Sequence, residues 1–178
     1  ISESQAPYGY VRNSSDVYSF NFNYLPETTA KATFSHEFVN DRTTAKIHIF
    51  KVDKETGLPV PQGDATLEGA VYGLYARDDI MHPDGATGVV FKANDLVATM
   101  TTDANGDAEV NNLYLGNYYV KEITPPEGYL LDEEEHDVVC DYEGDLVAEV
   151  SRSTTSKEQV MKQPFQLIKV SDNGDDTE

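Results

Sequence analysis

One sequence feature constrains this chain more than any other: it repeats itself with a period of about 118 residues. The segment ESQAPYGY (3–10) and the segment EITPPEGY (122–129) share the pattern Glu-x-x-x-Pro-x-Gly-Tyr at an offset of 119. The segment IHIFKVD (47–53) returns as FQLIKVS (165–171) at an offset of 118. Two independent matches at nearly one spacing indicate tandem repeats, and the period is long enough for a whole domain.

The period also sets the predicted domain boundaries. We predict the C-terminal part of one repeat in 1–44, a complete repeat in 45–163, and the first strand of a following repeat in 164–178. Because the chain then begins inside a repeat, we predict that it is part of a longer protein.

The charge balance excludes two classes of partner. The 178 residues carry 13 Lys and Arg against 32 Asp and Glu, which gives a formal net charge of −19. Such a chain repels nucleic acid and anionic membrane surfaces, so we expect neither as a partner. No apolar run approaches the roughly 18 residues of a membrane helix, so we expect no membrane insertion. Cys140 is the single Cys and the four His (36, 48, 82, 136) are scattered, so we expect no internal disulfide, metal site or cofactor.

Segments rich in Val, Ile, Tyr, Phe and Thr alternate with turn sequences such as KETGLP (54–59) and DANGD (103–107). This predicts an all-β fold, an antiparallel β-sandwich, with a loop at 81–88. The predicted strands are Ala45–Asp53, Gly69–Ala76, Leu96–Thr102, Ala108–Val110, Tyr118–Thr124, His136–Tyr142, Leu146–Arg152 and Glu158–Met161. The predicted core residues are Ile47, Ile49, Leu67, Val71, Leu74, Tyr118, Val120, Val138 and Cys140.

Three inward-facing apolar rows end in a polar residue, because alternate residues of a strand share a face. These residues are Lys51, Glu122 and Asn40, and Lys169 recurs at the position of Lys51 one repeat later. Burying an isolated charge is costly, so such groups are kept only if they are paired, neutralised or consumed in a covalent bond. Two simpler interpretations stay open: the Lys51 ammonium reaches water at the strand end, or Glu122 pairs with Lys51.

Four segments together resemble a known family: IHIFKVDKETG (47–57), LEGAVYGLYA (67–76), TTDANGDAEVNNLYLGNYYVKE (101–122) and ITPPEGYLL (123–131). They are similar to the collagen-adhesin B-type domain (CnaB, SpaA-like) of Gram-positive surface proteins and pilins. The resemblance covers the complete repeat and reaches its flanks. It implies a prealbumin-like, immunoglobulin-like sandwich that is exported and displayed in tandem on the cell wall, anchored through regions outside this chain.

The resemblance also implies an autocatalytic isopeptide bond between a Lys and an Asn or Asp. Lys51 would be the nucleophile and Glu122 the catalytic acid and base. In the adjacent repeats, Glu3 and Lys169 are the corresponding residues. Asn40, which lies 11 residues before Lys51, would be the acceptor of the first repeat.

The acceptor of the complete repeat departs from this pattern. Counting 11 residues back from Lys169 reaches Glu158 rather than an Asn or Asp. We expect its longer side chain to misplace the carbonyl group, so that no bond to Lys51 is completed. Lys51, Glu122 and Glu158 would then form a buried polar cluster in which one Glu carries a proton.

Tandem repetition favours a structural role, as a stalk or backbone module of a surface adhesin or pilus-like protein whose partners are the neighbouring repeats. The alternative is a binding module that recognises a host extracellular protein or glycan through its end loops, above all 77–95. Nothing indicates an enzyme that acts on external substrates. The tetrapeptide at 25–28, LPET, resembles a sorting signal but lacks the following Gly, and we expect a loop there.

Overall fold

The structure is a computed structural model that describes residues 1–21 and 33–169. Within these ranges the protein contains strands and no helix, so no helix there could cross a membrane. The strands are β1 (Thr44–Asp53), β2 (Val71–Ala76), β3 (Ile80–Met81), β4 (Val89–Phe91), β5 (Leu96–Thr101), β6 (Asp107–Leu113), β7 (Gly116–Thr124), β8 (His136–Cys140) and β9 (Glu149–Glu158). The tetrapeptide 25–28 and the end of the predicted strand at 164–178 lie outside the described residues.

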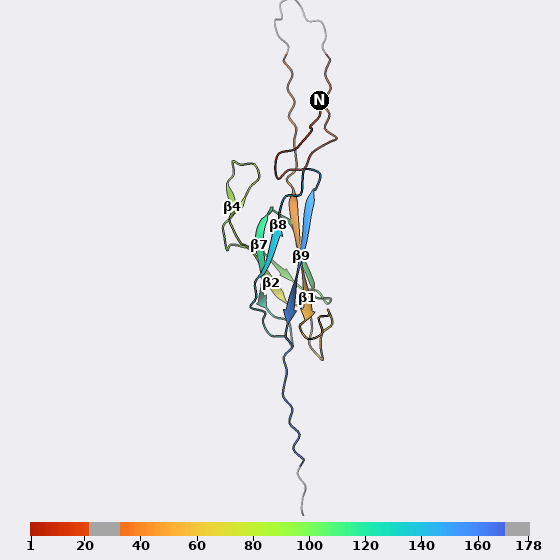
Figure 1. Cartoon of the computed structure of the whole chain (residues 1–178), viewed down its shortest axis with the longest axis vertical. Coiled ribbons are helices and arrows are strands. Elements are labelled where there is room, and N and C mark those ends of the chain that lie inside the picture. The colour runs from red at the N-terminus through yellow and green to blue at the C-terminus, as the bar shows by residue number, and fades with distance from the viewer. Residues whose placement is uncertain (22–32, 170–178) are drawn as a thin grey trace, which may run out of the picture.

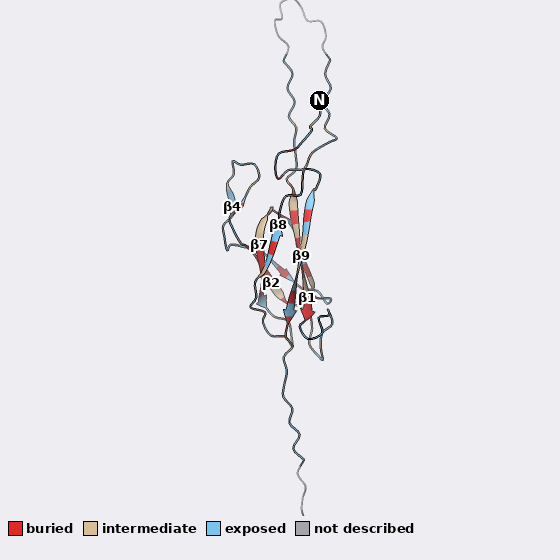
Figure 2. Ribbon diagram, viewed as in Figure 1, coloured by how far each residue is buried: buried red, intermediate tan, exposed pale blue. Residues whose placement is uncertain are grey.

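Two sheets face each other, one with the order β6-β1-β9 and one with the order β5-β2-β7-β8. Figure 2 shows buried and more exposed residues alternating along β1 and β9, as the period of two requires. The all-β sandwich is thus confirmed. Val71 is the one predicted core residue that is only partly buried, and its neighbour Tyr72 is buried instead. The register shift between Val71 and Tyr72 in the pairing of β2 with β7 accompanies this exchange.

One strand pairing differs from the expected antiparallel arrangement. β1 and β9 run parallel over ten residue pairs, from Thr44 opposite Glu149 to Asp53 opposite Glu158. They are the first and last strands of the sandwich, so no hairpin joins them and the rest of the domain serves as their crossover. As Figure 1 shows, the chain enters β1 at the end that carries residues 1–21 and leaves β9 at the opposite end.

The last strand was predicted as two pieces, and this is wrong. β9 is continuous through the Ser- and Thr-rich stretch 151–156, where the hydrogen-bonded ladder to β1 holds it although few of its side chains are apolar. The predicted strand Glu158–Met161 therefore does not exist as a separate strand, and Glu158 is the last residue of β9. The predicted loop at 81–88 lies mostly in the turn of the small β3–β4 hairpin.

Cys140 provides a probe of this core. It is fully buried, and burial raises the pKa of its thiol to about 11. We therefore expect alkylation by iodoacetamide at pH 8 to be about a hundredfold slower in the folded protein than in denaturant. Raising the thiol pKa by about two units lowers the fraction of reactive thiolate by about that factor. Mass spectrometry of the quenched reaction measures both rates. Equally fast labelling of the folded chain would contradict the core position of Cys140.

Candidate functional site

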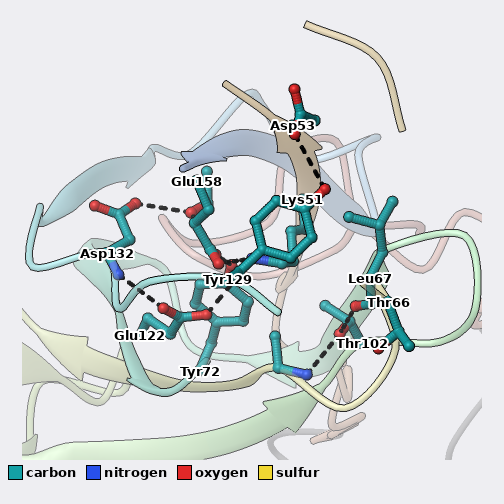
Figure 3. Close-up of polar contacts among 12 residues, drawn as sticks. Lys51, Asp53, Thr66, Leu67, Tyr72, Thr102, Glu122, Tyr129, Asp132 and Glu158 are labelled. Carbon is teal, nitrogen blue, oxygen red and sulfur yellow. Dashed lines mark hydrogen bonds and ion pairs between the residues drawn. The ribbon is translucent and has the colours of Figure 1, made fainter. Parts of the chain in front are cut away.

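The structure brings together Lys51, Glu122 and Glu158, the three residues predicted for the complete repeat. Lys51 lies near the end of β1, Glu158 ends β9, and Glu122 comes from β7 of the facing sheet. All three side chains are 0% exposed. The Lys51 Nζ contacts Oε2 of Glu158 and lies 3.7 Å from Oε1 of Glu122. Figure 3 shows the three side chains pointing toward one another. The result is a charged cluster inside the sandwich, shielded from water.

The strand register explains how Glu158 reaches Lys51. Lys51 pairs with Ser156 across β1 and β9, and Glu158 lies two residues further along β9 on the same face. Its side chain is therefore a diagonal neighbour of Lys51. The contact between Nζ and Oε2 means that the additional methylene of Glu158 does not keep its carboxyl group away from Lys51.

Burial dominates the electrostatics of the cluster. It lowers the pKa of Lys51 to about 8, although the nearby charges of Glu122 and Asp132 act in the opposite direction. Burial likewise raises the pKa of Glu122. The Tyr72 hydroxyl donates a hydrogen bond to Oε1 of Glu158 at 2.6 Å, and burial raises the pKa of Tyr72, so this donor keeps its proton.

Sequence reasoning missed a second layer of polar residues around the cluster. The backbone N–H of Asp132 donates to Oε2 of Glu122 at 2.8 Å, and Ser156 Oγ donates to Oδ2 of Asp132 at 2.7 Å. His136 Nε2 lies 2.9 Å from the same Oδ2. Burial opposes ionisation of Asp132, but the hydrogen bonds from Ser156 and His136 outweigh it and lower its pKa. Within the described residues, no group of three His, Cys, Asp or Glu side chains is arranged to hold a metal ion.

The Gly-Tyr end of the repeated box has a structural task of its own. Tyr129 is fully buried, and its hydroxyl donates to Oδ2 of Asp53 at 3.1 Å. Asp53 also accepts two backbone N–H groups from the turn that follows β1. Gly128 has a φ of +86°, and a Cβ there would come within 2.6 Å of the Ala65 Cβ, so a side chain does not fit. The box thereby fixes the end of β1, two residues beyond Lys51.

The residues predicted for the adjacent repeats are only partly brought together. Asn40 Nδ2 donates to Oε1 of Glu3 at 2.7 Å. The other two oxygens of this pair, Oε2 of Glu3 and Oδ1 of Asn40, are buried and have no hydrogen-bond partner among the described residues. Lys169 is exposed and lies in a segment without regular structure.

The segment 1–44 reproduces backbone contacts that close the sandwich of 45–163, at the sequence offset of the predicted repeat. Each contact links the Gly-Tyr turn to the strand end or linker that lies beside it. The hydrogen bond from Thr43 N to Gly9 O corresponds to the one from Met161 N to Gly128 O. Likewise, the hydrogen bond from Val11 N to Asp41 O corresponds to the one from Leu130 N to Gln159 O. The matched bridges are Tyr10 with Arg42 and Tyr129 with Val160. The similarity found in the sequence therefore extends to local structure.

The two facing sheets and their site define a prealbumin-like sandwich. The family model described as the SpaA prealbumin-like fold domain matches residues 45–155, and the chain belongs to this family. A search of curated proteins finds no match.

Several solved structures are similar to this chain. The TIE protein of Bacillus anthracis is 24% identical, with a TM-score of 0.59 over 89% of this chain and 24% of that chain. A minor pilin of Streptococcus agalactiae is 22% identical, with a TM-score of 0.43 over 71% of this chain and 49% of that one. The major pilin SpaA of Corynebacterium diphtheriae is 14% identical, with a TM-score of 0.47 over 65% of this chain and 30% of that one. This chain thus spans a quarter to a half of these proteins. The likeness to the TIE protein shows the fold alone.

Proposed function

We propose that this chain is a load-bearing stalk module of a Gram-positive surface adhesin or pilus-like protein, exported and held at the cell wall through regions outside this chain. One observation carries the proposal: the first and last strands are parallel neighbours, and the chain enters and leaves at opposite ends. Tension between the two ends pulls β1 and β9 past each other along their length. All ten residue pairs of the ladder then resist together, instead of opening one after another.

The buried cluster reinforces the same two strands. Lys51 in β1 contacts Glu158 in β9, close to the point where the chain leaves the sandwich. Charge attraction is stronger in such a water-free setting than at the surface, provided that the pair stays together. The cluster therefore acts as a lock across the loaded ladder. No reaction on an external substrate is part of this proposal.

The tandem arrangement belongs to the proposal as well. The matched hydrogen bonds support residues 1–44 as the C-terminal part of a preceding repeat, with Glu3 and Asn40 as its counterparts of Glu122 and Glu158. The lysine of that repeat would precede residue 1, as Lys169 would serve the repeat that begins in 164–178. The partners of the module are then its neighbouring repeats.

Single-molecule stretching of the chain tests the proposed stalk role. With handles at Thr44 and Glu158, we expect one high-force event that releases about 115 residues, the span from β1 to β9, or roughly 400 Å of chain. Handles at Thr44 and Glu149, which are paired neighbours, load the ladder one pair at a time and should open it at a much lower force. Equal forces in the two geometries would refute the load-bearing role. A covalent link between Lys51 and Glu158 would instead suppress the release in the first geometry.

A further inference from the structure

A cavity of about 440 Å³ lies at the entry end of the sandwich, between the turn that contains Gly9 and the β3–β4 hairpin. Gly9 has a φ of +82°, and a Cβ there would come within 2.7 Å of the Pro83 Cβ. The turn therefore packs its backbone directly on Pro83 and closes one edge of the cavity. The two walls come from the two parts of the chain, 1–44 and 45–163, so the cavity is incomplete without either.

The lining of the cavity has two chemically different halves. Its floor is apolar and includes Ile80, Leu115 and the buried Cys140. Its rim carries the rings of Tyr8 and Tyr114 and the exposed carboxylates of Asp79 and Asp141.

Several polar groups of the rim have no partner among the described residues. In the described ranges, the hydroxyl groups of Tyr8 and Tyr114 and the carboxylate of Asp141 have no hydrogen-bond or ion-pair partner. Asp79 uses only Oδ1, which accepts the backbone N–H of Ala93 at 2.8 Å. The ring faces are already in use: the Arg42 guanidinium lies 4.2 Å from the centroid of the Tyr114 ring, and Tyr8 packs on Tyr142 with ring centroids 4.7 Å apart. The free hydroxyl groups and carboxylates of the rim are the groups that can receive hydrogen-bond donors and positive charge.

We propose that this cavity binds a lysine or arginine side chain of a basic partner protein. An apolar floor suits the aliphatic stem of such a side chain, and the free tyrosine hydroxyl groups together with the carboxylates suit its charged head. The formal net charge of −19 draws basic partners from a distance and repels anionic ones. A neutral glycan would use the tyrosine rings but would gain little from the charge. Binding here goes beyond the stalk role, which does not need a ligand.

The test titrates the isotope-labelled chain with Nα-acetyl-lysine methylamide and with the matching arginine derivative, followed by amide chemical shifts. We expect shifts at the residues that line the cavity and a lower affinity when the salt rises from about 0.01 M to about 0.15 M, because the Debye length then falls from about 30 Å to about 8 Å. The disaccharide N-acetyllactosamine is titrated in parallel as a neutral probe. Failure of this test leaves the stretching result unaffected, so the two proposals are judged separately.

Two matched variants distinguish binding in the cavity from a general effect of the negative charge of the chain. Asp141→Asn should weaken binding of the cationic probes roughly two- to fivefold, the effect of one exposed charge pair. Asp64→Asn removes an exposed carboxylate outside the cavity lining and should leave binding unchanged. Cavity shifts with the disaccharide but not with the cations would overturn the proposal in favour of a glycan site. It is also overturned if neither probe shifts these residues, or if both variants weaken binding equally.

Discussion

Replacing Lys51 by alanine is expected to lower the free energy of unfolding by about 3–5 kcal/mol, the usual cost of removing one partner from a buried ion pair. The substitution leaves Glu122 and Glu158 inside the sandwich without the cation between them. Tyr72 still donates to Glu158 but cannot neutralise its charge. Urea denaturation followed by circular dichroism measures the change, provided that the transition remains two-state.

Two variants show whether the lost energy belongs to the buried cluster. Lys157→Ala removes an exposed lysine next to Glu158 on β9 and should change stability by no more than about 0.5 kcal/mol. The double variant Lys51→Met with Glu158→Leu removes both charges in contact and should recover most of the loss, since apolar replacements of buried ion pairs are often neutral or stabilising. A cost below about 1 kcal/mol for Lys51→Ala would contradict a structural role for the cluster.

The sequence predicted the site residues better than their surroundings, and the reason is geometric. Alternation along one strand shows which face a residue occupies, so Lys51 and Glu122 stood out as charges that end apolar rows. Glu158 was found by counting residues across the repeat. Asp132 and Ser156 gave no such signal, because neither ends an apolar row. They join the cluster only through the register of β9 on β1 and the path of the chain after β7.

Long-range pairing accounts for the other differences. The stretch 151–156 is polar, and its extended form depends on the ladder with β1, more than a hundred residues earlier in the chain. Local patterns do not contain that information, so the parallel pairing and the continuity of β9 were both missed. The cavity at the entry end escaped prediction for the same reason. It forms only where the Gly9 turn packs against Pro83, a contact between segments far apart in sequence.

The intact mass of the natural chain is expected to equal the sum of its residues, with no water lost between Lys51 and Glu158. Reach is not the obstacle, since Nζ contacts the Glu158 carboxyl group. Protonation is the obstacle: the pKa of Lys51 is lowered only to about 8, so at pH 7 most of the amine is protonated and lacks the lone pair of a nucleophile.

Glu158→Gln isolates this effect, because it keeps the length of the side chain and removes its charge. Without the carboxylate opposite Nζ, Lys51 loses its contacting counter-ion, and burial then favours the neutral amine. Attack on the amide carbon would form the Nζ–Cδ bond and release the amide nitrogen as ammonia, with Glu122 carrying the proton between them. We therefore expect this variant to weigh one ammonia less than the sum of its residues, and the same variant with Lys51→Arg to show no loss. A natural chain that is short by one water would overturn the account at once. A Glu158→Gln chain of full mass would show that charge is not what keeps the bond from forming.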